Sequence, residues 1–153
     1  MAYVNSILQP GESIRAIGKL HWIVFTRAFA LLVVGLVVLI YAGGLPQQAS
    51  RLVQLVGWGI IALAALAFLQ AWFVRWITEF AITTHRLIYK RGFLSRYTVE
   101  MNMDKVETVN VDQSLLGRLL DYGSIRVLGT GQGIEKLEGM ASPIELRNAI
   151  NGR

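Results

Sequence analysis

Two long apolar runs dominate the hydrophobic pattern of this 153-residue chain. Residues 28–42 and 52–74 contain no charged side chain, and a short polar segment with two adjacent glycines and a proline separates them. A helix needs about 20 apolar residues to cross a bilayer core about 30 Å thick. The second run meets that length. The first meets it if its start extends back through Phe25, Thr26 and Arg27, because the long basic side chain of Arg27 can reach the headgroups. The pattern predicts a transmembrane helical hairpin at 22–76, with helices over 22–42 and 51–76.

Basic residues lie almost entirely on one side of this predicted hairpin. The loop between the two helices carries only Arg51, whereas the flanking segments carry Arg15, Lys19, Arg27, Arg75, Arg86, Lys90 and Arg91. Loops rich in Lys and Arg remain in the cytoplasm. We therefore expect a multi-pass protein with both termini cytoplasmic, in which residues 1–21 form a cytoplasmic leader.

After the hairpin the hydrophobic period changes to two. Apolar and polar side chains alternate through 79–83, 97–103 and 109–112, which indicates half-buried antiparallel strands joined by short turns. Ser142-Pro143-Ile144-Glu145 has the pattern of a capping box with proline at the first helical position, which predicts a helix over 143–150. Residues 77–153 are thus expected to form a small strand-rich barrel or sandwich with a short C-terminal helix.

Composition argues against most kinds of chemistry. The chain has no cysteine, and His21 and His85 are its only histidines, without a carboxylate pair at ligand spacing, so we expect no metal site. No serine lies in a G-x-S-x-G motif, so we expect no enzyme and no cofactor. The net charge of +5 comes without a dense basic stripe interleaved with aromatics, so nucleic acid is not an expected partner. The glycines at Gly129, Gly131 and Gly133 are more typical of a hairpin or bulge than of a phosphate-binding loop.

The densest basic group begins where the second predicted helix ends. Its members are Arg75, Arg86, Lys90, Arg91 and Arg96. A Lys or Arg near an anionic membrane surface contributes about 1 kcal/mol to binding, so the group is a candidate lipid-facing surface. The same residues are also explained by the usual excess of Lys and Arg in cytoplasmic segments of membrane proteins, which requires no binding site, and both interpretations stay open.

A leucine-rich segment interrupts the strands. Ser114 is placed as the N-cap of one or two helical turns, and their apolar side chains are Leu115, Leu116, Leu119 and Leu120, followed by Tyr122. The leucines either plug the mouth of the barrel or form a self-association surface. The many small residues of the second predicted helix also allow two interpretations: they pack against the first helix of the same chain, or against another copy of the protein.

Several motifs resemble the bacterial PH-like domain family, in its membrane-anchored branch. The most specific is the block from Gln113 to Tyr122; Asp104-Lys105-Val106-Glu107 and Gly129-Thr130-Gly131 match as well. Thr83–Leu87 resembles the first hairpin of that family, and Pro10-Gly11-Glu12 and His21-Trp22 also fit. The resemblance spans nearly the whole chain, including the apolar hairpin.

The resemblance implies a fold and a broad role. The fold would be a membrane α-helical hairpin plus a mainly-β PH-like barrel with a short C-terminal helix, and residues 77–153 would be the cytoplasmic PH-like domain. The role would be that of a non-enzymatic protein of the bacterial inner membrane that forms homo-oligomers or binds another membrane protein, linked to envelope stress or antimicrobial resistance. The alternative is a sensor of anionic lipid or a small ligand. The short turn Thr84-His85-Arg86 argues against recognition of inositol phosphates.

Overall fold

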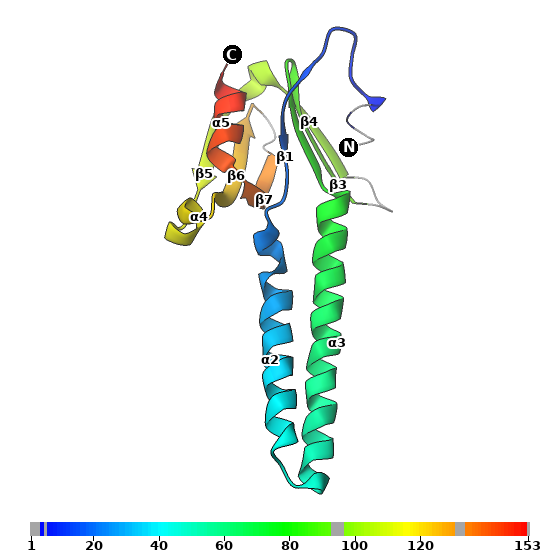
Figure 1. The fold of residues 1–153 in the computed structure, drawn as a ribbon. Coiled ribbons are helices and arrows are strands. Elements are labelled where there is room, and N and C mark those ends of the chain that lie inside the picture. Colours follow the sequence, from blue (N-terminus) through cyan, green and yellow to red (C-terminus); the bar gives the residue numbers. More distant parts are fainter. Residues whose placement is uncertain (1–3, 5, 93–96, 131–133, 153) are drawn as a thin grey trace. The chain divides into compact units, whose positions relative to one another are not determined.

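The computed structural model describes residues 4, 6–92, 97–130 and 134–152 (Figure 1). The chain forms two compact units: a β unit made of residues 1–21 and 75–153, and a helical hairpin made of residues 22–74. The hairpin is therefore inserted within the β unit. This division differs from the predicted one, because residues 1–21 belong to the β unit and are not a separate leader.

The β unit contains two antiparallel sheets. The first has four strands in the order β1 (Ile14–Gly18), β2 (Glu79–Thr83), β3 (Arg86–Arg91) and β4 (Tyr97–Asn102). The second has three strands in the order β5 (Val106–Asp112), β6 (Tyr122–Gly129) and β7 (Ile134–Ala141). A short 3-10 turn, η2 (Met103–Lys105), connects β4 to β5. The predicted strands and the tight turn at residues 84–85 are thus confirmed, and the helical hairpin connects β1 to β2.

The segment after β1 links the two sheets. Leu20 forms an isolated bridge with Met140 of β7. The amide of His21 donates to the Gly139 carbonyl at 2.7 Å, and the amide of Ala141 donates to the Lys19 carbonyl at 2.9 Å. The residues that lead into the hairpin are consequently fixed by backbone hydrogen bonds to the second sheet.

The core lies between the sheets and is covered by the last helix. Buried side chains from both sheets meet there, and α5 (Pro143–Asn151) adds Leu146 and Ile150. Gly18 allows a close approach, because a Cβ at this position would lie 2.5 Å from side-chain atoms of both Phe80 and Met140. Two sheets and a C-terminal helix around one core are consistent with the PH-like fold.

Strand β2 departs from the predicted half-buried pattern. Residues 80–83 are all buried, whereas alternation predicts burial of every second one. Val4 packs with Ala81 and Ile88 in a second apolar cluster, with Ile7 and Ile14 at its margin. The N-terminal segment thus covers the face of β2 that the alternation assigned to solvent.

The two predicted helix starts in the β unit differ in outcome. Helix α4 (Leu115–Leu119) begins at Ser114, whose hydroxyl accepts from the Gly117 amide at 3.0 Å, so that N-cap is confirmed. The predicted capping box before α5 is wrong. Ser142 has a left-handed backbone with φ of 45° and makes no capping hydrogen bond, because its hydroxyl donates to the Asp121 carboxylate instead.

The helical hairpin consists of α2 (Thr26–Gly43), preceded by the 3-10 turn η1 (Trp22–Phe25), and α3 (Gln47–Ile77) (Figure 1). Helix α3 begins four residues before its predicted start at Arg51. The most apolar 18-residue window has a mean hydropathy of 2.7 within Trp22–Gly43 and 2.3 within Gln47–Ile77, and less than a fifth of each window is buried. Both helices are long and apolar enough to span a membrane.

Small residues bring α2 and α3 into close contact. A Cβ at Gly57 would lie 2.6 Å from the Leu39 side chain, and one at Gly35 would lie 2.7 Å from the Ile61 side chain. A Cβ at Gly59, by contrast, would have no neighbouring atom within 4 Å. Packing within one chain therefore explains part of the small-residue pattern in α3, and the Gly59 position remains available to another contact.

Candidate functional site

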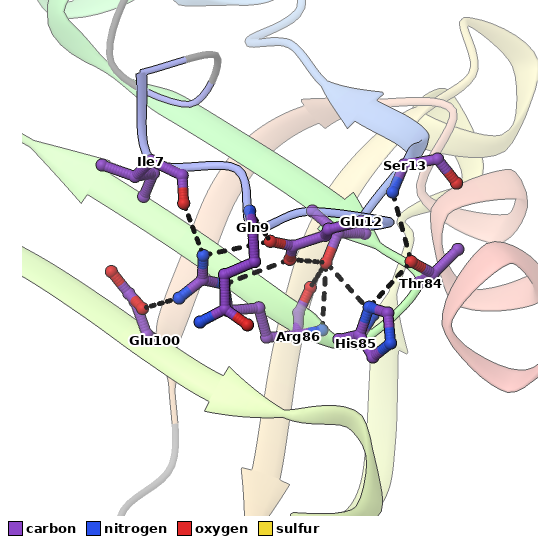
Figure 2. Close-up of polar contacts among 9 residues, drawn as sticks. Ile7, Gln9, Glu12, Ser13, Thr84, His85, Arg86 and Glu100 are labelled. Carbon is purple, nitrogen blue, oxygen red and sulfur yellow. Dashed lines mark hydrogen bonds and ion pairs between the residues drawn. The ribbon is translucent and has the colours of Figure 1, made fainter.

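A buried ion pair connects the N-terminal segment to the first sheet (Figure 2). Arg86 begins β3, and its Nε and Nη2 atoms donate to the Glu12 carboxylate, each at 3.1 Å. Its Nη1 atom donates to Glu100 on β4 at 2.7 Å. The side chain of Arg86 is 13% exposed and that of Glu12 only 1%. Arg86 is therefore bound to protein partners, which argues against its predicted place in the lipid-facing group.

Further hydrogen bonds surround this pair. The Thr83 hydroxyl donates to Glu12 at 2.6 Å, and the Gln9 amide donates to the same carboxylate at 2.9 Å. Nη2 of Arg86 also donates to the Ile7 carbonyl at 2.7 Å. Gly11, with φ of 83°, makes the turn that returns the chain toward these partners. Figure 2 shows the carboxylate enclosed between the N-terminal segment and the β2–β3 turn.

Both members of the pair remain charged at neutral pH. Burial alone raises the pKa of Glu12, but hydrogen bonds from Thr83, the Gln9 amide and Arg86 lower it more, and the pKa falls to about 2. The hydrogen bond to Glu12 raises the pKa of Arg86, although burial opposes that change. The pair is thus a permanent structural link and not a group that exchanges protons near neutrality.

The remaining members of the predicted basic group do not share one face. Lys90 is half-buried on the same side of β3 as Arg86 and stands opposite Glu79 in the β2–β3 register. Arg91 is exposed and, by alternation, points to the other side. Arg75 lies in the last turn of α3, and Arg96 lies outside the described residues. The structure thus divides this basic group.

The predicted leucine segment is exposed. Leu115, Leu116 and Leu119 are 85%, 63% and 80% exposed, and Leu120 is just above a third exposed at 38%. The buried residue of α4 is Gly117, where a Cβ would lie 2.6 Å from the Tyr122 carbonyl oxygen. The barrel-plug interpretation is therefore wrong, because the helix packs through its glycine and turns its leucines outward.

Tyr122 has a different environment from the leucines. It is half-buried, and its ring stacks on His21 with centroids 5.3 Å apart and an interplanar angle of 24°. Its carbonyl accepts from the Gln113 side chain at 3.1 Å. Tyr122 thus connects α4 to the segment that enters the hairpin, which a sequence motif alone did not indicate.

The described part of the chain contains no cluster of side chains suited to hold a metal ion. Within it, no three His, Cys, Asp or Glu side chains gather in one place. Gly129 has a packing role, because a Cβ there would collide with the Lys105 carbonyl oxygen and lie 2.9 Å from the Met101 sulfur. Gly131 and Gly133, the other glycines of the possible phosphate-binding loop, lie outside the described residues.

The sequence analysis did not identify Glu12 as the partner of Arg86. Pro10-Gly11-Glu12 indicated a turn, and nothing local to it indicated an arginine 74 residues away. Thr83 and Thr84, just before Arg86, were a weak signal that a polar partner binds at this turn, because hydroxyls at a tight turn readily form hydrogen bonds with nearby polar groups.

A comparison with known families agrees with this architecture. A family model described as the bacterial PH domain matches residues 16–151, which includes the second half of β1, the helical hairpin, strands β2 to β7 and α5. The comparisons with curated proteins and with solved structures gave no match. Because the match covers most of the sequence and the two sheets with their terminal helix are consistent with that fold, this chain belongs to the bacterial PH domain family.

Proposed function

We propose that this chain is a non-enzymatic protein of the bacterial inner membrane. Its hairpin spans the bilayer, both termini face the cytoplasm, and the PH-like domain binds protein, chiefly other copies of itself. The low burial of both apolar helices supports membrane insertion, because core helices of soluble proteins are mostly buried. The excess of basic residues outside the α2–α3 loop supports the orientation.

The observation that carries the association proposal is the exposed leucine surface, formed by Leu115, Leu116, Leu119 and Leu120 of α4 and its C-terminal end. Exposure of a contiguous apolar patch to water is unfavourable in free energy, and such patches often mark interaction sites. Burial of a leucine side chain contributes about 1.5–3 kcal/mol, so even part of this surface supplies useful binding energy. A second copy is the simplest partner, and closed cyclic symmetry is the common arrangement for such assemblies.

The biological setting is proposed from the family alone. PH-like domains are typically non-catalytic interaction modules, and the membrane-anchored branch is linked to envelope stress or antimicrobial resistance. Another membrane protein is the alternative partner for the leucine surface. The alternative function, sensing of anionic lipid or a small ligand, is supported by a pocket beside β1 and β2 whose lining includes Lys19 and Arg75.

The test is the molar mass of the full-length protein in detergent, measured by light scattering after size exclusion. We expect a discrete oligomer for the unmodified chain and a monomer for the double variant Leu115→Ser/Leu119→Ser. Leu128→Ser is the matched control, since this leucine on β6 is 40% exposed but lies outside the surface. A monomeric unmodified chain, or a double variant that assembles as well as the control, contradicts self-association through these leucines.

A further inference from the structure

A pocket of about 200 Å³ lies on the β unit beside β1 and β2. Apolar side chains of Val4, Ile17 and Trp76 contribute to its lining. Its charged lining residues are Lys19, Arg75 and Glu79. The pocket thus combines an apolar wall with two cationic groups and one carboxylate, and neither the sequence motifs nor the family match assigns a ligand to it.

The position of the pocket in the chain bears on what reaches it. Lys19 lies three residues before Trp22, where the first apolar helix begins, and Arg75 and Trp76 lie in the last turn of α3. The lining therefore includes both the exit of the chain toward the hairpin and its return. If the hairpin spans the bilayer, as proposed above, covalent continuity holds these residues at the cytoplasmic interface, the depth that tryptophan favours.

The charges of the lining favour an anion. The Glu79 carboxylate already accepts from the Val4 amide at 3.3 Å, and Lys90 stands opposite Glu79 in the β2–β3 register. Lys19 and Arg75 leave the lining with a net positive charge. Arginine and lysine are the side chains that bind phosphate oxygens best.

The size of the pocket restricts the ligand further. Sites that enclose a whole drug-sized molecule measure about 300–1,000 Å³. This pocket is smaller, so it suits one end of a molecule whose remainder lies elsewhere. A phospholipid meets this condition, because its acyl chains remain in the bilayer.

We propose that this pocket binds the headgroup region of an anionic phospholipid from the cytoplasmic leaflet. Lys19 and Arg75 pair with the phosphate, and Ile17 and Trp76 contact the adjoining carbons. The proposal depends on membrane insertion of the hairpin but not on self-association through α4. It also places lipid recognition away from Arg86, which the structure assigns to the buried pair with Glu12.

The test uses full-length protein in mild detergent and native mass spectrometry, which counts bound lipid molecules per subunit. Phosphatidylglycerol is the anionic probe, and phosphatidylcholine is the zwitterionic comparison. We expect one phosphatidylglycerol per subunit and weaker retention of phosphatidylcholine. Each basic residue contributes about fivefold to binding, so Lys19→Gln/Arg75→Gln should weaken phosphatidylglycerol binding about 30-fold.

Two control variants separate the pocket from general charge. Arg91→Gln/Lys105→Gln removes the same charge outside the pocket and should retain the lipid. Ile17→Trp fills the pocket without changing charge and should displace it. Equal binding by the Lys19→Gln/Arg75→Gln variant and its charge control overturns the proposal, as does equal retention of the two lipids.

Two further experiments are needed. One distinguishes binding of a lipid from binding of a soluble anion, and the other distinguishes the lipid site from self-association. Inorganic phosphate that displaces the lipid completely at millimolar concentration would indicate a site for a soluble anion and would overturn the lipid assignment. The Leu115→Ser/Leu119→Ser variant should retain its lipid even when it is monomeric, because the count is made per subunit. Failure of self-association and failure of the lipid site are therefore separate results.

Discussion

Arg86 and Glu12 are 74 residues apart in the sequence, yet two nitrogen atoms of the guanidinium donate to the carboxylate at 3.1 Å. The helical hairpin, residues 22–74, lies between them in the chain. The pair therefore joins the segment that precedes the hairpin to the strands that follow it. An insertion of this length separates β1 from β2 in sequence, and this buried link helps to hold both parts in one β unit.

Removal of the Glu12 charge should destabilise the β unit. In Glu12→Gln the guanidinium of Arg86 stays buried and loses its most buried partner, a change that costs about 3 kcal/mol in comparable pairs. Hydrogen exchange of the β2 and β3 amides in the full-length protein should then accelerate by about 100-fold. Glu138→Gln is the control, because Glu138 pairs with Lys136 at 3.7 Å on the surface and such pairs contribute about 0–1 kcal/mol. Equal effects of the two substitutions would show that the Glu12 pair is no stronger than a surface contact.

The same pair predicts how stability depends on pH. The pKa of Glu12 is about 2 in the folded chain and 4.5 as its ordinary value. A folded pKa below the unfolded one stabilises the fold fully above about pH 5, and this contribution is lost as the pH falls toward 2. The unfolding free energy of the unmodified chain should therefore decline between pH 5 and 2 more steeply than that of Glu12→Gln. Parallel profiles for the two proteins would disprove the role of Glu12 in acid sensitivity.

Two glycines of α3 should respond differently to the same substitution. Gly57→Leu places side-chain atoms where Leu39 lies and should destabilise the hairpin by about 1–3 kcal/mol. Gly59→Leu meets no atom within 4 Å of its Cβ and should leave hairpin stability unchanged. Thermal unfolding of both variants in detergent provides the measurement. A Gly59→Leu variant with normal thermal stability but reduced molar mass would show that this face of α3 packs against another copy.

Two serines that look like equivalent N-caps in the sequence should also differ. Ser114→Ala removes the bond to the Gly117 amide and should cost about 1 kcal/mol. Ser142→Ala removes only an exposed bond to Asp121 and should cost about 0.5 kcal/mol or less. Hydrogen exchange of the α4 and α5 amides reports the two changes separately. If Ser142→Ala destabilises α5 more than Ser114→Ala destabilises α4, Ser142 acts as a helix cap after all, contrary to the structure.

Features that depend on local pattern were predictable from the sequence. Length without charge identified both apolar helices, because bilayer thickness sets one requirement for every such segment. Alternation located the strands, since successive side chains of a strand point to opposite faces. Ser114 was recognisable as an N-cap because its partner, the Gly117 amide, lies three residues away.

Features that depend on distant partners were decided only by the tertiary structure. The sequence analysis grouped Arg86 with the neighbouring basic residues as a candidate lipid-facing surface, but in the structure Arg86 forms a buried ion pair with Glu12. It predicted a solvent-facing side for β2, which Val4 and its neighbours cover. It left the orientation of the α4 leucines open until the close approach of Gly117 to Tyr122 was known. Local periodicity fixes which side chains share a face, whereas the side that is buried depends on which distant segment packs against it.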